Sequence, residues 1–374
     1  MIDRKDSNVI VSFSRTPIGS FLGSLSSIPA PHLGALVIKD LLRKSKCSNN
    51  QVSEVIMGNV LQAGIGQAPS RQAAIFSNLH KSVQCLTINK VCGSGLKSIM
   101  IADLELMKEE SNIIIAGGME NMSQVPHYIK NFRKGKKLGA DTLVDGMIYD
   151  GLWDPYNDFH MGNCAEHLNS NWKISRKEQD EFASESYSRA LKAIKEGRFK
   201  DEIVPIEVAD KRGDKQLIEN DEEPFRGKID KFNSLKPAFS KHGTITAANA
   251  SSINDGAAGV MLMNDSYAKN NNFNPFFRIL SHISYATDPI DFTIAPITAI
   301  ERVCKKSNLS LKDIGLFEIN EAFSCVPLAA IKKLKLDLSK VNIYGGAVSL
   351  GHPIGASGAR ILVTLMNAML KNNV

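Results

Sequence analysis

The feature that most constrains the fold is an alternation of two sequence patterns in the first third of the chain. Short runs rich in Val and Ile, at residues 8–14, 53–61 and 112–118, have the composition of buried strands. Between the first two runs, residues 32–45 repeat apolar side chains at helical spacing. This order predicts an α/β fold with helices on both faces of a sheet. The alternation resumes after residue 277, so two α/β halves are expected.

The central part of the chain has a different composition. From residue 120 to 243, charged and polar residues, Gly and Pro dominate, and one clear helix is expected at residues 176–197. This region is therefore predicted to be an inserted loop domain that covers the surface. The expected organisation is an N-terminal α/β half at 1–119, the insertion at 120–243, return strands of the first half at 244–270, and an incomplete C-terminal α/β half at 271–374.

Composition excludes several classes of protein. Hydrophobic residues make up 43% of the 374 residues and charged residues 22%, which is typical of a globular protein with a substantial core. The sequence has no apolar run long enough to span a bilayer, so no membrane association is expected. No export signal is expected either, because the first residues have no apolar stretch of the kind that such a signal carries. Six scattered cysteines without paired spacing indicate reduced thiols, and a cytoplasmic location is expected.

The stretch from Ile88 to Met100 places Cys92 between an expected strand and an expected helix. Gly93 and Gly95 would let the backbone turn tightly and let a ligand approach closely. The positive end of the helix dipole is expected to lower the pKa of the thiol from about 8.5 into the range of roughly 3.5–7.5. Cys92 is therefore a candidate nucleophile, although most free cysteines are small buried side chains.

Two further stretches carry side chains suited to chemistry. His352 lies in a glycine-rich loop ahead of a helix expected to begin near Ser357, where it would serve as acid, base or oxyanion donor. A phosphate-binding loop is the alternative interpretation, but the lysine of a Walker loop is missing. Asn320, between an apolar strand and a helix, would either cap the helix or hold a water or a substrate carbonyl.

Two other clusters have simpler explanations. The basic run at residues 130–137 lacks an aromatic platform or a helix-turn-helix pattern, so a solvated loop is favoured over a nucleic-acid site. His160, Cys164 and His167 have spacings that zinc would tolerate. However, no fourth ligand stands nearby, and one helical face explains the spacing. A structural role is therefore favoured for these three residues.

Six motifs follow one another along the chain: KVCGSGLKS, GGMENMS, HMG, TAANAS, NEAFS and GGAVSLGHPIGASGAR. Together they resemble the thiolase family, and the resemblance runs from Val11 to the last expected helix. The HMG triplet resembles the short-chain acetyl-CoA acetyltransferases, and PIDFTIAP at residues 289–296 resembles the mitochondrial acetoacetyl-CoA thiolase branch. The implied fold is the thiolase fold, with two similar α/β halves in a layered α-β-α-β-α core and an inserted loop domain.

The resemblance also implies a reaction and its chemical groups. Thiolases join two acetyl-CoA molecules into acetoacetyl-CoA and CoA, or run the reverse cleavage. The implied ligands are therefore these three molecules, and no cofactor is required. Cys92 would carry the acyl group, and His352 would take the proton of the thiol. Asn320 would hold a water that forms an oxyanion site with the His352 ring.

Binding residues and assembly are implied in the same way. A homotetramer is expected, and residues 125–146 lie where the tetramer loop of the family would be. Tolerance of a 2-methyl branch is expected from Phe at position 292. The residues that would line the pantetheine and acyl channel are Leu152, His160, Met161, Phe239, Ala247, Ser251, Phe292, Ala322 and Phe323. A potassium ion, which the mitochondrial branch binds, would be held by Tyr187 and by the carbonyls of Ala247, Ala248, Ala250 and Val348.

One departure from the family pattern is large. Thiolases carry a second catalytic cysteine in a CxGGG motif after the final helix, and none of the six cysteines here stands in such a motif. The motif supplies the base that deprotonates the second acetyl group. A C-terminally truncated chain is therefore expected, which would form acetyl-Cys92 with almost no net turnover. The alternatives are a non-catalytic CoA-binding or assembly protein on a thiolase body, and a 3-ketoacyl-CoA thiolase of broader chain length.

Overall fold

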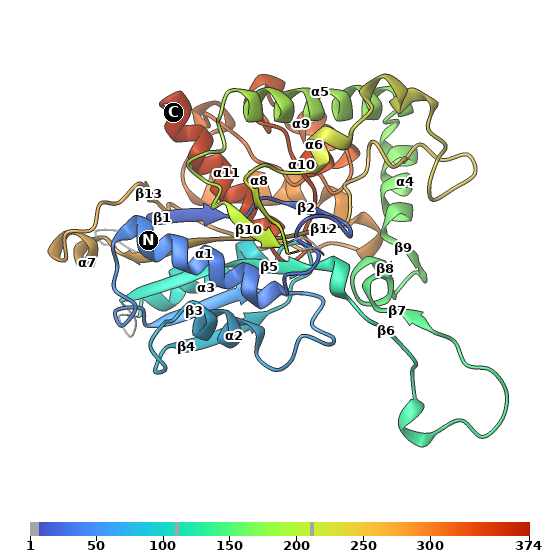
Figure 1. Cartoon of the computed structure of the whole chain (residues 1–374). Coiled ribbons are helices and arrows are strands. Elements are labelled where there is room, and N and C mark those ends of the chain that lie inside the picture. The colour runs from blue at the N-terminus through green and yellow to red at the C-terminus, as the bar shows by residue number, and fades with distance from the viewer. Residues whose placement is uncertain (1–6, 109–111, 210–212) are drawn as a thin grey trace.

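The computed structural model describes residues 7–108, 112–209 and 213–374, and its centre is one large β-sheet (Figure 1). In the described part of the chain this sheet has seven strands, in the order β13-β1-β12-β5-β3-β4, with β2 paired to β12. The neighbours β3, β4 and β5 run parallel, whereas β12 pairs antiparallel with both β5 and β1. The strands are β1 (Asn8–Arg15), β2 (Gly19–Ser20), β3 (Glu54–Gly58), β4 (Gln84–Ile88), β5 (Ile113–Asn121), β12 (Asn254–Asn264) and β13 (Phe277–Arg278).

Helices cover both faces of the sheet, as the alternating patterns predict. On one face, α1 (Ala30–Ser45) and α2 (Pro69–Phe76) bury apolar side chains against the strands. On the other face, α3 (Ser94–Leu106) and α11 (Ser357–Asn372) do the same. Strands covered on both sides carry nearly continuous apolar sequences, and β1, β5 and β12 are accordingly buried along almost their whole length.

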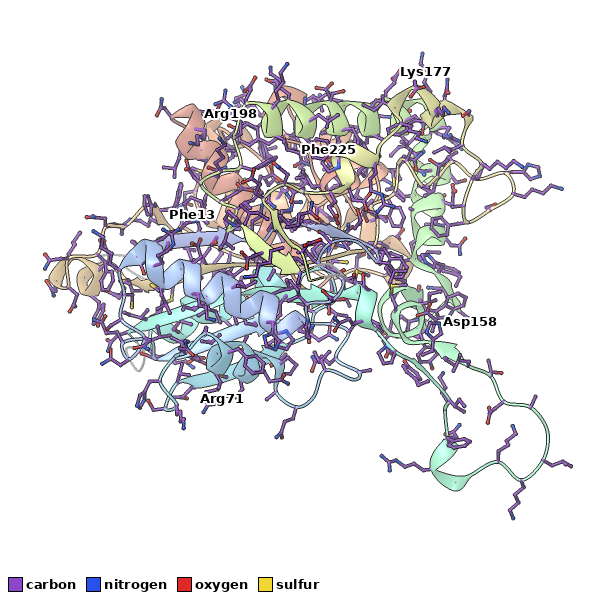
Figure 2. The ribbon with its side chains drawn as sticks, in the orientation of Figure 1. Phe13, Arg71, Asp158, Lys177, Arg198 and Phe225 are labelled. Carbon is purple, nitrogen blue, oxygen red and sulfur yellow. The ribbon has the colours of Figure 1, made fainter. Side chains whose placement is uncertain are left out.

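The central region is rich in loops: residues 127–172 lie at the right of the view, and α5 runs along its top (Figure 1). Its longest helix, α5 (Arg176–Lys195), begins at a capping box in which Ser175 and Glu178 exchange hydrogen bonds, so the helix expected at 176–197 is confirmed. The loop between β6 and β7 runs away from the body, and its side chains, like Lys177 on α5, point into solvent (Figure 2). The other elements here are β6 (His127–Tyr128), β7 (Val144–Asp145), β8 (Trp153–Asp154), β9 (Phe159–His160), α4 (Met161–Trp172), β10 (Ile206–Ala209), β11 (Lys215–Ile218) and α6 (Glu223–Arg226).

The segment ahead of β12 differs from the expected return strands. Residues 244–250 are irregular, with a turn at 247–249, and only β12 is a strand. The side chain of Asn249 accepts a hydrogen bond from the Thr246 amide at 2.8 Å and donates one to the Thr244 carbonyl at 3.0 Å. These side-chain bonds satisfy backbone groups that a strand would pair with a neighbour, so the segment curls instead.

The segment ahead of Asn320 also differs from the expected strand. Phe317 makes a single parallel bridge with Val341, and the side chain of Asn342 bonds both the amide and the carbonyl of Ile319. Within the described residues no strand follows β13, and the C-terminal part is mainly helical. Its helices are α7 (Asp265–Asn270), α8 (Ala295–Lys306), α9 (Cys325–Leu334), α10 (Ala347–Leu350) and α11.

Short 3-10 and π turns connect these elements, at Met122–Gln124, Phe132–Lys134, Ile148–Leu152, Ile229–Ser234, Pro289–Ile294, Leu311–Asp313 and Leu338–Lys340. Among the helices of the described residues, none combines the length and the apolar character needed to cross a membrane. The domain boundaries expected from the sequence remain predictions.

Candidate active site

Cys92 lies in the short turn between the end of β4 and the start of α3. The hydroxyl of Ser94 donates to the Val91 carbonyl at 2.6 Å and accepts from the Lys90 amide at 2.8 Å, which closes the turn. Val91 has a φ of +47°, a left-handed conformation that is unusual for a β-branched residue. Backbone strain of this kind persists where the surrounding structure holds a residue in a functional position.

Gly95, three residues after Cys92, serves a purpose that the sequence did not indicate. Neither Gly93 nor Gly95 adopts a positive φ. A Cβ atom on Gly95 would lie 2.7 Å from the Ala359 amide, and one on Gly358 would lie 2.5 Å from the Leu96 amide. These glycines therefore let the N-terminal ends of α3 and α11 meet backbone to backbone. That close approach brings the loop carrying His352 to the turn carrying Cys92.

The thiol of Cys92 and the imidazole of His352 form a pair. His352 Nε2 lies 3.1 Å from Cys92 Sγ, and Nδ1 lies 2.6 Å from the hydroxyl of Ser357. The amide of His352 donates to the side-chain oxygen of Asn254 at 2.8 Å, which fixes the backbone. A nucleophile within reach of a base, with the base oriented by a third group, is the arrangement used in nucleophilic catalysis.

Burial decides the charge state of this pair. It raises the pKa of the Cys92 thiol to about 11, and the charge of Glu120 acts in the same direction. Burial also lowers the pKa of His352 to about 4, assisted by the charge of Arg360. The expected lowering of the thiol pKa is therefore wrong, because desolvation outweighs the helix end. At neutral pH the pair is a neutral thiol beside a neutral imidazole, and attack requires His352 as a base.

Cys92 and His352 open into an apolar cavity of about 200 Å³. His160 stacks on Phe239 at 4.6 Å between ring centroids, and burial lowers the pKa of His160. Ala247 is exposed and does not line the cavity, because the turn at 247–249 points it outward; Ala250 lines the cavity instead. Eight predicted channel residues line the cavity: Leu152, His160, Met161, Phe239, Ser251, Phe292, Ala322 and Phe323.

Asn320 lies next to this cavity in sequence but is not part of its lining. Its side-chain oxygen is buried and has no hydrogen-bond partner among the described residues. A buried amide oxygen of this kind is the group that an ordered water satisfies. The water-holding role of Asn320 remains a prediction, and the orphaned oxygen supports it.

Glu120 connects the two loops that flank the pair. It is fully buried at the end of β5 and accepts hydrogen bonds from the Asn59 side chain at 2.7 Å and from the amides of Val60, Leu61 and Gly355 at 2.9, 3.2 and 2.9 Å. Burial raises its pKa to about 7. Glu120 thus ties the loop after β3 and the loop after His352 to the central sheet.

Sequence reasoning did not assign site roles to Glu120, Asn254 or Ser357. The position of Glu120 at the end of an apolar strand was a signal in the sequence. A carboxyl group buried there needs several hydrogen-bond donors around it. No comparable signal marks Asn254 or Ser357. Their contacts join segments of the chain that sequence periodicity does not place together.

The other predicted ligand sets are only partly assembled. Of the residues expected to hold potassium, Tyr187, Ala248 and Val348 pack in one buried cluster, whereas Ala247 is exposed and Ala250 lines the apolar cavity. His167 contacts Asn171 and Asp291, away from the ring pair of His160, and the described residues contain no group of three potential zinc ligands. Of the cysteines in the described part of the chain, Cys92 alone lines the cavity.

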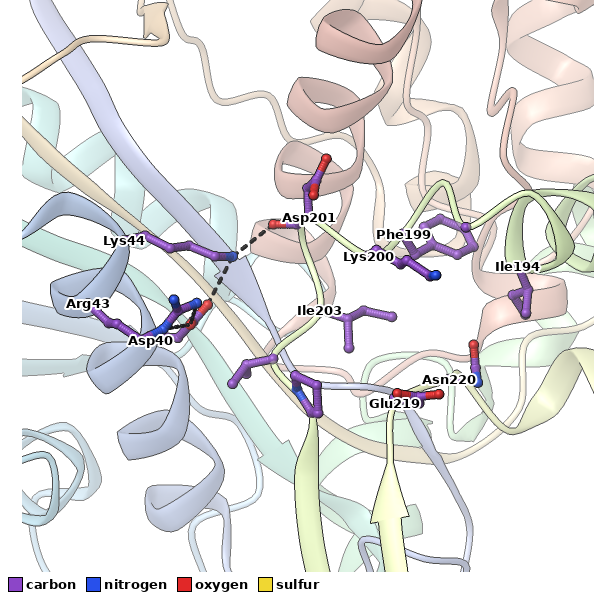
Figure 3. A pocket seen from close by; sticks show the side chains of 13 residues that line it. Asp40, Arg43, Lys44, Ile194, Phe199, Lys200, Asp201, Ile203, Glu219 and Asn220 are labelled. Carbon is purple, nitrogen blue, oxygen red and sulfur yellow. Dashed lines mark hydrogen bonds and ion pairs between the residues drawn. The ribbon is translucent and has the colours of Figure 1, made fainter.

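A larger groove of about 770 Å³ lies elsewhere, between α1 and the segment that follows α5 (Figure 3). Lys44 reaches across it to the Asp201 carbonyl at 2.8 Å, and it also pairs with Asp40 on its own helix at 2.9 Å, as Arg43 does. The contact between Lys44 and Asp201 joins the two walls. The lining contains neither Cys nor His, so the groove does not compete with Cys92 as a reactive site.

An α/β fold that presents a thiol and an imidazole at the base of an apolar cavity defines a class of proteins with a cysteine nucleophile. Within that class, residues 8–266 match the family "Thiolase, N-terminal domain" and residues 273–374 match "Thiolase, C-terminal domain". The chain therefore belongs to the thiolase family, and the resemblance seen in the motifs is confirmed.

Similar proteins agree with this assignment. The chain is 48% identical to an acetyl-CoA acetyltransferase of Yarrowia lipolytica, over 98% of this chain and 92% of that protein. It is also 48% identical to an acetyl-CoA acetyltransferase of Cupriavidus necator, over 98% and 93%. The Acat5 thiolase of Ascaris suum, solved in complex with coenzyme A, superposes with a TM-score of 0.92 at 43% identity, over 97% of this chain and 93% of that one. The expected thiolase fold is confirmed, and these comparisons do not bear out the expected truncation.

Proposed function

We propose that this protein is an acetyl-CoA C-acetyltransferase, which condenses two acetyl-CoA molecules to acetoacetyl-CoA and CoA and catalyses the reverse cleavage. The observation that carries the proposal is the 3.1 Å contact between Cys92 Sγ and His352 Nε2 at the base of an apolar cavity. Family membership and the names of the relatives support the same reaction. The substrates are CoA thioesters, and the chemistry calls for no other cofactor.

The first half of the reaction follows from the geometry of the pair. His352 Nε2 takes the thiol proton as Cys92 Sγ attacks the carbonyl carbon of acetyl-CoA. A new C–S bond forms to Cys92, and the C–S bond to CoA breaks. The departing CoA thiolate takes the proton back from His352, so the pair returns to neutrality. A water held by Asn320, together with the His352 ring, would stabilise the oxyanion of the tetrahedral intermediate.

Exposure of the protein to acetyl-CoA tests this half-reaction directly. Peptide mapping by mass spectrometry is expected to find one acetyl group on Cys92. A coupled assay for acetoacetyl-CoA formation and cleavage then measures net turnover. Tight CoA binding without acetylation of Cys92 would favour the alternative, a non-catalytic CoA-binding protein.

The size of the cavity leads to a prediction about substrates. About 200 Å³ beside Phe292 suits a short acyl group, so acetoacetyl-CoA and 2-methylacetoacetyl-CoA are expected to be cleaved much faster than long 3-ketoacyl-CoA chains. Phe292→Ala should raise kcat/KM for a 3-ketoacyl chain two methylenes longer than acetoacetyl-CoA, relative to kcat/KM for acetoacetyl-CoA, by about 10-fold. This figure assumes about 0.8 kcal/mol for each methylene. Competition kinetics with paired substrates measure the ratio. Faster turnover of a long chain by the unmodified protein would support the 3-ketoacyl-CoA thiolase alternative instead.

The proposed enzyme is a homo-oligomer, and an open sheet edge supports this. In the described part of the chain β4 pairs only with β3, so its other edge offers unpaired backbone groups. Leu86 on β4 is 40% exposed. Val91 in the turn after β4 is 43% exposed, and Leu104 on α3 is 44% exposed. The loop between β6 and β7, expected to mediate a tetramer, also exposes Leu138 at 92%. Apolar surface of this kind is typical of subunit contacts.

A charge on the β4 edge is expected to weaken this association. Leu86→Asp would place a carboxylate in the apolar contact, and burying it without a partner would dissociate the oligomer. Light scattering after gel filtration should show a smaller assembly for Leu86→Asp. The control Leu217→Asp alters a leucine on β11 that is 58% exposed, and it should leave the assembly intact. An unchanged mass for Leu86→Asp would exclude β4 as the contact.

Two finer features of the proposal remain to be measured. Six unpaired cysteines support a reducing, cytoplasmic location. The cluster of Tyr187, Ala248 and Val348 supports a potassium site, although the exposed Ala247 is outside it. Turnover compared in potassium and in tetramethylammonium buffers would show whether the ion matters.

A further inference from the structure

The hydroxyl of Ser357 contacts two groups at the start of α11. Its oxygen lies 2.6 Å from Nδ1 of His352 and 2.9 Å from the backbone carbonyl oxygen of Pro353. Ser357 is 1% exposed and His352 is 6% exposed, so bulk water does not compete for either contact. Every proton in this small network must therefore be assigned among these three residues.

One assignment makes hydrogen bonds of both contacts, and in it the Ser357 hydroxyl joins the amides of Ala356 and Ser357 as a donor to the Pro353 carbonyl. A carbonyl oxygen only accepts, and a hydroxyl has a single hydrogen, so that hydrogen goes to the Pro353 carbonyl. The hydroxyl oxygen then faces Nδ1 with a lone pair, and Nδ1 must carry the proton. Nε2 is consequently the unprotonated nitrogen, and it faces Cys92 Sγ at 3.1 Å. In the other tautomer Nε2 would carry its hydrogen toward the thiol and could not accept the thiol proton.

We propose that Ser357 is a positioning residue for acyl transfer, which holds His352 in the tautomer that can accept the proton of Cys92. This inference rests on the proposed function of the Cys92–His352 pair. The other groups that fix the loop act on its backbone: Asn254 bonds the His352 amide and Glu120 bonds the Gly355 amide. Those bonds place the ring but leave its tautomer free.

A neutral hydroxyl suits a buried pair better than a carboxylate would. A carboxylate beside Nδ1 would stabilise the protonated imidazolium, whereas an uncharged acceptor leaves the imidazole neutral. The low pKa of His352, about 4, agrees with a partner that carries no charge. Ser357 therefore provides orientation without changing the charge of the base.

The test combines a rate with a spectroscopic measurement of the tautomer. In protein labelled with nitrogen-15 on the imidazole rings, NMR distinguishes Nδ1–H from Nε2–H, and a His352→Asn variant assigns the signal. The unmodified protein should show Nδ1–H for His352. Ser357→Ala should show a large Nε2–H population and acetylate Cys92 about 10- to 100-fold more slowly, within the range of a general-base effect.

Two further variants separate orientation from simple loss of packing. Ser357→Thr keeps a hydroxyl that can donate and accept, so it should retain Nδ1–H and a rate within about threefold of the unmodified protein. Ser98→Ala removes another buried hydroxyl, whose oxygen lies 2.7 and 2.6 Å from the carbonyl oxygens of Gly95 and Gly117 and does not contact His352. It should leave the His352 tautomer unchanged.

Several outcomes would overturn the inference. A proton on Nε2 of His352 in the unmodified protein would by itself overturn the inference, even if Ser357→Ala failed to fold. A folded Ser357→Ala with Nδ1–H and an unchanged acetylation rate would do so as well. Absence of Cys92 acetylation in the unmodified protein would instead contradict the proposed function, and the tautomer measurement would still decide the role of Ser357.

Discussion

Cys92→Ala is expected to abolish acyl transfer, with a loss of at least about 10⁴-fold in the rate of CoA thioester cleavage, as for other nucleophiles that act as a unit with their base. The physical reason is that no other cysteine of the described residues lines the cavity, so no second sulfur can take the acyl group. Mass spectrometry after acetyl-CoA exposure should find no acetylated peptide, and a coupled assay should find only background turnover.

Cys85→Ala is the matched control, because Cys85 is also partly buried and unpaired but lies on β4, outside the cavity. It should keep nearly full activity. In the unmodified protein, a small alkylating agent should label Cys92 before the other five cysteines, and acetyl-CoA should slow that labelling. Labelling of Cys47 or Cys304 at the same rate as Cys92 would contradict the role of Cys92 as the nucleophile.

His352→Asn is expected to slow acetylation of Cys92 by about 10³- to 10⁴-fold. A thiol with a pKa of about 11 is almost wholly protonated at neutral pH, so it depends on a neighbouring base. The side chain of asparagine has no basic nitrogen to accept the proton. Rapid-mixing measurements of acetyl-Cys92 formation give the rate. His32→Asn, which alters an exposed histidine stacked on Phe76, is the control and should react normally.

The pH dependence of Cys92 acetylation also tests the role of His352. Because burial lowers its pKa to about 4, the imidazole stays neutral and able to accept a proton well below its usual value of 6.5. The acetylation rate should therefore fall on the acid side near pH 4 rather than near pH 6.5. This acid limb should disappear in His352→Asn. A limb centred near pH 6.5 in the unmodified protein would show that the imidazole is more hydrated than its surroundings indicate.

Local sequence patterns predicted the elements that carry the site. The apolar runs that became β1, β3 and β5, the helix beginning at Ser357 and the position of Cys92 ahead of α3 all follow from short-range periodicity. Of the return strands expected at residues 244–270 only β12 formed, and the strand expected ahead of Asn320 did not form. There the side chains of Asn249 and Asn342 bond backbone groups from neighbouring turns, and periodicity carries no information about such bonds.

The sequence by itself determined the strand–helix order, the motifs that mark a thiolase and the choice of Cys92 and His352 as candidate reactive side chains. Only the tertiary structure decided where those side chains lie and how far they are buried. Cys92 and His352 are 260 residues apart along the chain, and close packing of α3 on α11 brings them to 3.1 Å. Their pKa values depend on how completely water is excluded, which is a property of the assembled core. For that reason a thiol that its local sequence would ionise is held neutral until His352 takes its proton.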